Sequence, residues 1–209
     1  MSERHGHVDL EAELARRLAS GQLKETASLA IESYGPEVLN FLEAMLRDHA
    51  DSGDAFAQAC EDLWRGLPRF EGRSSLKTWF YTLARHAASR LRNSARHHRQ
   101  AALSEITDLA DRIRSSTRPH LQTEVKTGLA AIRAALDEED RMLLVLRVDR
   151  GMSWNDVARV MADEHDGNGD AQLPRVAARL RKRFQAVKQT IRERALASGL
   201  IPSDSDAAP

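Results

Sequence analysis

Apolar residues recur at every third or fourth position along nearly the whole chain, and this spacing restricts the possible fold more than any other feature of the sequence. Leu10, Leu14 and Leu18 start the pattern near the N-terminus, and Leu76 and Phe80 continue it in a later, basic segment. Residues at such intervals lie on one face of an α-helix, whereas a strand would alternate apolar and polar residues. No segment of the sequence shows that alternation, so it predicts an all-α fold.

Glycine, proline and short polar side chains indicate where individual helices begin and end. Gly35-Pro36 is expected to end one helix, and the next helix is expected to end near Asp48 to Gly53. A Ser or Asp directly before an apolar helical pattern is a typical N-cap, because its oxygen accepts a hydrogen bond from the first turn. The predicted N-caps are Ser74, Asp137 and Ser153.

A less regular stretch divides the chain into two helical domains. Residues 100–122 include a Ser-Ser-Thr-Arg-Pro run and are predicted to form a flexible linker that contains at most one short helix. The first domain is expected at residues 9–99 and the second at residues 123–198. Residues 199–209, with two Pro and two Asp, are predicted to be a disordered tail.

Charge is strongly segregated along the chain, although its 31 basic and 31 acidic side chains cancel. Residues 1–64 carry 5 basic and 13 acidic side chains, whereas residues 65–99 carry 9 and 1. Residues 100–174 are again acidic, and residues 175–194 carry 8 basic side chains and 1 acidic one. Two compact basic blocks on helices indicate two contacts with a polyanion; the alternative is a pair of solvated helix faces.

Several classes of protein are excluded by composition. No apolar run approaches the roughly 20 residues that span a bilayer, and the N-terminus is polar, so we expect neither a membrane segment nor a signal peptide. The single cysteine, Cys60, excludes an internal disulfide and a multi-cysteine metal site. It lies on an apolar stripe and is expected to be buried and inert. These features predict a cytoplasmic protein.

The sequence contains no recognisable catalytic or cofactor-binding motif. The acidic loop from Glu164 to Asp170 resembles a calcium loop, but Arg175 stands where a bidentate Glu would be needed. Histidines at positions 86, 97 and 98 lack a Cys or acidic partner at the spacing of metal ligands. We therefore expect no metal, no cofactor and no enzymatic activity.

The second domain has the outline of a helix-turn-helix. A helix ends at a turn around Arg150-Gly151, a short helix follows, and the basic helix comes after a loop at residues 163–174. Such a unit places its last helix in the major groove of duplex DNA. Val176, Leu180 and Val187 are expected to face the core. The candidate duplex-binding residues are Arg175, Arg179, Arg181, Lys182 and Arg183.

The most specific segment of the first domain runs from Phe70 to Arg85, where aromatic residues are interleaved with Arg and Lys and a glycine lies in the preceding loop. Aromatic rings stack on unpaired bases, basic side chains attract phosphates, and a glycine-containing loop could hold an extruded base. The alternative is ordinary core packing, since Phe80 lies on the apolar stripe. Trp79 and Tyr81 lie off that stripe, so at least one of them is expected to be exposed or in a second interface.

Two segments resemble one known family. Trp64-Arg65-Gly66-Leu67-Pro68-Arg69-Phe70 and the residues up to Arg85 resemble the promoter-recognising domain of extracytoplasmic-function (ECF) sigma factors. Leu136 to Arg147, with Gly151-Met152-Ser153-Trp154, is similar to their fourth sigma domain. The resemblance implies a bacterial transcription initiation subunit whose partners are core RNA polymerase and promoter DNA, with an anti-sigma factor as a further partner. The family implies that the first domain opens the minus-ten element and the second reads the minus-thirty-five duplex.

The resemblance also assigns roles to residues. Residues implied to contact the separated minus-ten strand are Phe70, Glu71, Gly72, Arg73, Ser74, Lys77, Arg85, His86, Ser89 and Arg90. Residues on the helix implied to meet the polymerase clamp are Asp51, Asp54, Gln58 and Asp62. The connection at residues 163–174 is longer than the family's usual turn. Ala177 and Ala178 also stand where the family commonly has polar residues near the start of the recognition helix, which favours phosphate contacts and shape over direct hydrogen-bond reading in the second domain.

Two other functions remain compatible with the residues alone. A stand-alone helix-turn-helix regulator would explain the second domain but would leave the segment from Phe70 to Arg90 without a role. A helical adaptor that binds acidic partner proteins would explain the two basic blocks. Co-purification with core RNA polymerase would distinguish both from a sigma factor.

Overall fold

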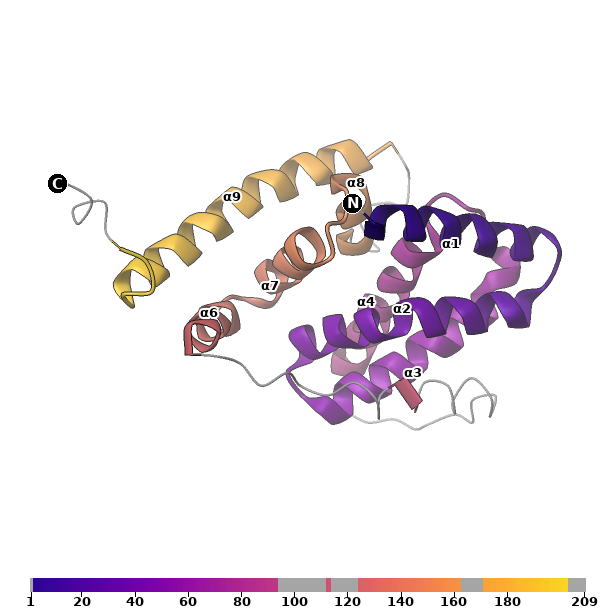
Figure 1. Ribbon diagram of the computed structural model, residues 1–209, viewed down its shortest axis with the longest axis horizontal. Helices are drawn as coiled ribbons and strands as arrows, with labels where there is room; N and C mark the ends of the chain where they lie inside the picture. Colours follow the sequence, from indigo (N-terminus) through magenta and orange to yellow (C-terminus); the bar gives the residue numbers. More distant parts are fainter. Residues whose placement is uncertain (1, 94–111, 114–123, 163–170, 203–209) are drawn as a thin grey trace. The chain divides into compact units, whose positions relative to one another are not determined.

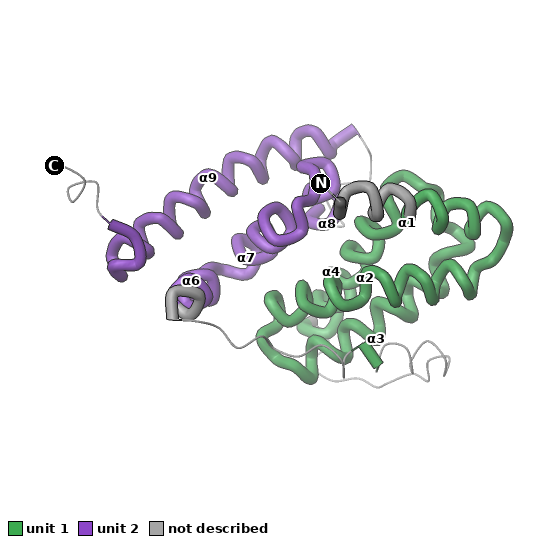
Figure 2. Tube along the Cα trace, in the orientation of Figure 1, with its two compact units in different colours: residues 1–118 green, residues 119–209 purple. Residues whose placement is uncertain are grey.

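The computed structural model describes residues 2–93, 112–113, 124–162 and 171–202, and every regular element in these ranges is a helix (Figure 1). The predicted all-α fold is confirmed. The chain forms two compact units, residues 1–118 and 119–209 (Figure 2). Most of the predicted linker and tail, and much of the 163–174 connection, lie outside the described residues. The functional domain boundaries given above stay predictions.

The first unit is a bundle of four helices in which α2, α3 and α4 pack against one another and α1 lies on α2 and α4. Its core contains large side chains from all four helices, including Leu14, Phe41, Phe56 and Phe80, each nearly or completely buried. The elements are α1 (Ser2–Ala19), α2 (Leu23–Leu46), α3 (His49–Gly66), a 3-10 turn (Leu67–Arg69) and α4 (Leu76–Asn93).

The helix break predicted at Gly35-Pro36 is wrong, because α2 runs through both residues. An internal proline costs about 3 kcal/mol through its missing N–H and its clash with the preceding turn. Ile31 before the proline and Leu39 after it are fully buried on one continuous face. Burial stabilises each such side chain by roughly 1.5–3 kcal/mol, so keeping both ends of the helix buried outweighs the local cost.

Gly35 also allows a close approach that a larger residue would block. A Cβ at this position would lie 2.7 Å from Cδ1 of Ile113 and 3.1 Å from Cζ of Phe56. Ile113 and Arg112 are the described part of the predicted linker; both are helical, and Ile113 is buried in the first unit.

Two further boundaries differ from the sequence prediction. The helix expected to end near Asp48 to Gly53 ends at Leu46, and α3 begins at His49 because the Asp48 side chain accepts a hydrogen bond from the Asp51 backbone N–H at 2.9 Å. Gly53 is buried inside that helix. The cap of α4 is Ser75 rather than Ser74, since the Ser75 hydroxyl oxygen accepts from Thr78 N–H at 3.0 Å.

Of the aromatic and cysteine residues that the sequence analysis singled out in the first unit, Tyr81 and Cys60 lie in the core. Tyr81 is completely buried and meets Phe41 edge to face, with ring centroids 5.2 Å apart. Trp79 is half-buried, so of the two residues predicted off the apolar stripe only Trp79 reaches the surface. Cys60 is buried as expected, and burial raises the pKa of its thiol above the ordinary value.

The second unit is built on α9, which packs against α6, α7 and α8. Asp137 and Ser153 cap α7 and α8 as predicted, and Gly151 makes the turn before α8 with a φ of 62°. Val176, Leu180 and Val187 are buried, also as predicted. The elements are α6 (Glu124–Ala134), α7 (Glu138–Leu144), a π-helical turn (Val145–Asp149), α8 (Trp154–Met161) and α9 (Leu173–Ala197).

Candidate nucleic-acid and polymerase interfaces

The loop between the 3-10 turn and α4 is supported by a short aromatic stack. The rings of Phe70 and Trp79 lie 4.8 Å apart between centroids, at an angle of 33°. Trp79 in turn lies over Gly66, where a Cβ would come within 2.8 Å of the indole. Phe70 is therefore held at one edge of the loop by α4, and it is half-buried rather than part of the closed core.

The tip of this loop is open. Glu71, Gly72 and Arg73 are all exposed, and the Arg73 guanidinium Nε donates to Glu71 Oε2 at 2.6 Å. Gly72 has a φ of 67°, and no atom lies within 4 Å of the position its Cβ would take. A glycine is favoured here by the backbone conformation, and it leaves room for another chain to approach the backbone closely.

The residues predicted on α4 divide into two groups. Lys77 is half-buried; its Nζ lies 2.8 Å from a Glu37 carboxylate oxygen, so it contributes to the interior of the bundle. Arg85 and His86 are half-buried and have partners within the protein. Ser89 and Arg90 are exposed, one turn further along the helix.

The predicted polymerase-binding residues lie on the exposed side of α3. Asp51, Asp54 and Gln58 are exposed, and Asp62 is half-buried. The Gln58 amide donates to Asp62 Oδ1 at 3.0 Å. The other Asp62 oxygen forms an ion pair with Arg90 of α4. The sequence placed Asp62 and Arg90 in two separate surfaces, and the structure joins those surfaces through this pair.

The predicted duplex-binding residues on α9 also fall into two groups. Arg175, Arg179, Arg181 and Lys182 are exposed. Arg181 lies over the Trp154 ring at 5.6 Å, and Arg147 lies over the same ring at 5.0 Å.

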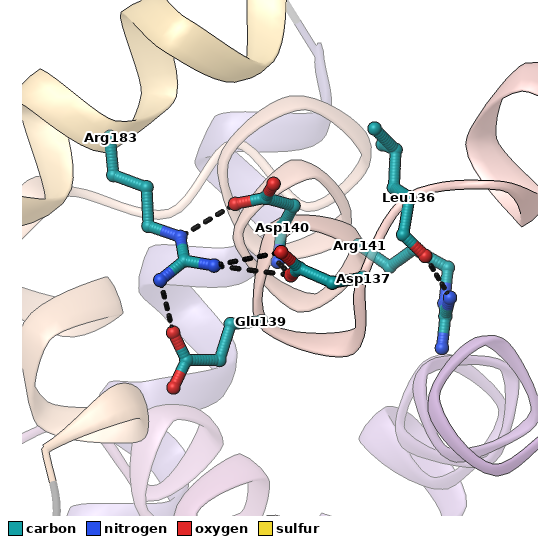
Figure 3. Close-up of polar contacts among 6 residues, drawn as sticks. All are labelled: Leu136, Asp137, Glu139, Asp140, Arg141 and Arg183. Atoms are coloured by element: carbon teal, nitrogen blue, oxygen red, sulfur yellow. Dashed lines mark hydrogen bonds and ion pairs between the residues drawn. The ribbon is translucent and has the colours of Figure 1, made fainter.

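Arg183 instead connects α9 to the N-terminal turn of α7 (Figure 3). Its Nε lies 2.6 Å from Asp140 Oδ1, its Nη2 lies 3.1 Å from both Asp137 oxygens, and its Nη1 pairs with Glu139. Partial burial disfavours the charge, but the hydrogen bond to Asp140 and the three carboxylates raise the pKa of the guanidinium. A phosphate would have to compete with three carboxylates for this side chain.

Sequence reasoning missed Glu11, whose carboxylate lies at the N-terminus of α4. It accepts hydrogen bonds from the backbone N–H groups of Leu76 at 2.9 Å and Lys77 at 3.0 Å. No local signal could have revealed this contact, since the partners are 65 and 66 positions apart.

The residues that the structure describes support neither a metal-binding site nor a membrane-spanning helix. Within these ranges no group of three His, Cys, Asp or Glu side chains is placed to hold a metal ion. No helix among them is both long and apolar enough to cross a membrane.

Comparison with known proteins identifies the family. Residues 30–98 match the Sigma-70 region 2 family. The chain is 27% identical over 143 residues to the ECF RNA polymerase sigma factor SigX of Bacillus subtilis, covering 66% of this chain and 74% of that protein. It is also 27% identical over 160 residues to the RNA polymerase sigma-H factor of Pseudomonas aeruginosa, covering 72% and 82% respectively. Together these matches support an ECF sigma factor of the sigma-70 family.

Proposed function

We propose that this sigma factor binds core RNA polymerase through the exposed acidic side of α3 and opens promoter DNA with the loop at residues 70–74 and the exposed part of α4. It directs transcription initiation and is not itself an enzyme. The observation that carries the proposal is the match of residues 30–98 to sigma-70 region 2, because α3, the loop and α4 all lie inside it. Since RNA polymerase is its partner, we place its action in the cytoplasm.

Charge supports the assignment of the two surfaces in the first unit. Asp51 and Asp54 expose negative charge on α3, which would repel a nucleic acid and suits a basic protein surface. Arg73 and Arg90 are exposed on the loop and on α4, where a phosphate backbone would be attracted and would compete with one carboxylate for each, Glu71 and Asp62. The half-buried Phe70 ring next to the open Gly72 backbone offers a stacking surface for an unpaired base.

For the second unit we propose that α9 binds the minus-thirty-five duplex. The exposed basic residues predicted to contact the duplex lie on the first three turns of the helix, while Val176 and Leu180 are buried against the core. An α-helix fits the major groove, and basic side chains along it can neutralise phosphates on both sides. An anti-sigma factor, a frequent partner of ECF sigma factors, would act by covering one of these surfaces.

Reconstitution with core RNA polymerase tests the function directly. Core polymerase would be mixed with the purified protein, the complex isolated by size-exclusion chromatography, and genomic DNA transcribed with the RNA 5′ ends mapped. We expect a stable complex and initiation at sites that share two sequence elements and need the added protein. Duplex binding without a polymerase complex would instead support a stand-alone regulator, and polymerase binding without initiation would support an adaptor.

The geometry of α9 predicts different behaviour for two adjacent cations. Lys182→Ala should weaken duplex binding and lower the slope of log affinity against log salt by about one, because one phosphate contact is lost. Arg179→Ala is expected to act in the same way. Arg183→Ala should leave the slope unchanged and lower the free energy of unfolding by about 1 kcal/mol, since its half-exposed ion pairs are screened by solvent.

Fluorescence anisotropy with a duplex promoter probe over a range of salt concentrations, together with thermal unfolding, measures both effects. A reduced salt slope for Arg183→Ala would show that Arg183 leaves its carboxylates to bind phosphate. An unchanged slope for both Lys182→Ala and Arg179→Ala would show that α9 does not bind the duplex.

A further inference from the structure

The start of α4, directly after the proposed strand-binding loop, is fixed by a residue from the other end of the first unit. Glu11 of α1 uses one carboxylate oxygen to accept from Leu76 N–H and the other to accept from Lys77 N–H. The next amide, that of Thr78, donates to the Ser75 hydroxyl. Three of the N–H groups that a helix N-terminus leaves without helical partners are therefore satisfied here, two of them by α1.

Glu11 is itself held in place from a second side. The hydroxyl of Tyr34, on α2, donates to Glu11 Oε1 at 2.8 Å, and the Tyr34 side chain is completely buried. Burial and this hydrogen bond raise the pKa of the Tyr34 hydroxyl, so it stays a donor. The Glu11 carboxylate thus links three helices at one point, and α4 cannot shift along its axis without breaking hydrogen bonds to α1.

The same contact has an electrostatic consequence. The N-terminus of a helix carries roughly half a positive charge and attracts anions, including phosphates. At α4 that place is taken by a carboxylate, which stabilises the helix end and repels a second anion. A bound strand would therefore be directed toward the exposed loop and the later turns of α4, rather than toward the first amides of the helix.

We infer that Glu11 is a positioning residue for strand capture: by fixing the first turn of α4, it holds the loop at residues 70–74 in the conformation that binds the separated strand. This inference rests on the proposed role of that loop. It gives α1 a function in promoter opening, although α1 lies outside the segment that matches sigma-70 region 2.

The test uses holoenzyme and a single-stranded oligonucleotide carrying the non-template minus-ten strand of a promoter mapped as described above. Glu11→Ala should weaken binding of this strand roughly 2- to 30-fold, the range expected for loss of a helix cap. Glu11→Gln keeps the side-chain length and one acceptor oxygen, so its effect should be intermediate. Affinity for core polymerase should not change with either variant.

Glu13→Ala is the matched control, because Glu13 lies on the same helix and pairs with Arg16 and Arg17 instead of α4. It should leave strand binding unchanged. Hydrogen exchange of the Leu76 and Lys77 amides, followed by NMR in the free protein, should be faster in Glu11→Ala and unchanged in Glu13→Ala. Measurements are made where the circular dichroism of every variant equals that of the wild type.

Three outcomes would overturn the inference. Faster exchange of both amides with unchanged strand affinity would show that Glu11 only stabilises the helix. A parallel loss of core-polymerase affinity would show general damage to the first unit. Phe70→Ala in the same assay separates the inference from the proposed function: if that variant also binds the strand normally, the loop does not capture it and both proposals fail.

Discussion

Replacing Phe70 by alanine should lower promoter opening roughly 5- to 150-fold, which corresponds to the loss of about 1–3 kcal/mol of base stacking. No ATP-binding motif is recognisable in the sequence, so we expect opening to be driven by binding of the separated strand. Phe70 is half-buried on Trp79 beside the open backbone of Gly72, where an unpaired base can reach it. Permanganate reactivity of unpaired thymines on a linear promoter measures the opened fraction.

The matched control for this prediction is Phe80, one of the aromatic core residues of α4. Phe80 is completely buried, so Phe80→Ala should lower the free energy of unfolding by about 3–5 kcal/mol. The temperature at which the helical circular dichroism is lost should fall accordingly. Phe70→Ala should unfold at nearly the wild-type temperature and bind core polymerase normally. Wild-type opening by Phe70→Ala at a promoter that the holoenzyme still occupies would contradict the strand-capturing role.

Arg90 is best tested separately from Phe70. Its guanidinium pairs with Asp62 on α3, so Arg90→Ala also removes the ion-pair partner of a carboxylate on the proposed polymerase surface. A combined Phe70 and Arg90 variant would therefore mix effects on strand capture and on polymerase binding. Asp62→Asn provides the comparison, because it breaks the same ion pair while Arg90 keeps its charge.

The sequence predicted the fold where local signals agree with packing. The apolar stripe of α4, the caps Asp137 and Ser153, and the buried side of α9 all appear as expected, because spacing and capping act over three or four residues. The sequence failed at Gly35-Pro36, where a local break signal is overridden by a buried face on both sides of it. No window of a few residues contains that information.

The sequence predicts the contacts of the candidate site less well than it predicts the fold, because these contacts join residues far apart in the chain. Residue type and resemblance placed Arg90 and Arg183 among DNA contacts, and these roles stay predictions. Both side chains have carboxylate partners in this structure, 28 positions away for Arg90 and 43 to 46 positions away for Arg183. Which cations are paired within the fold depends on helix packing, and a single sequence does not reveal it.

Charge reversal at Asp51 and Asp54 should weaken binding to core RNA polymerase roughly 10- to 100-fold. Both carboxylates are exposed on the acidic side of α3, and placing lysines there would oppose a basic partner surface with like charge. The change at Asp51 also removes a favourable charge from the first turn of α3. That costs only about 0.3–1 kcal/mol, so the protein should remain folded.

A control with the same change in net charge is available on α2. Glu25 and Glu32 are also exposed, and Glu25 also lies in the first turn of its helix, so Glu25→Lys with Glu32→Lys reproduces the electrostatic change elsewhere on the first unit. We expect this control to bind core polymerase within about threefold of the wild type, because exposed charges outside a contact are screened within roughly 10 Å at 0.1 M salt. Competition for core polymerase against the labelled wild-type protein, at two salt concentrations, measures both variants. Equal losses for the two pairs would mean that the overall charge of the first unit governs binding and that α3 is not the contact surface. A loss confined to the Asp51 and Asp54 variant, and smaller at high salt, would identify α3 as the surface that meets the polymerase.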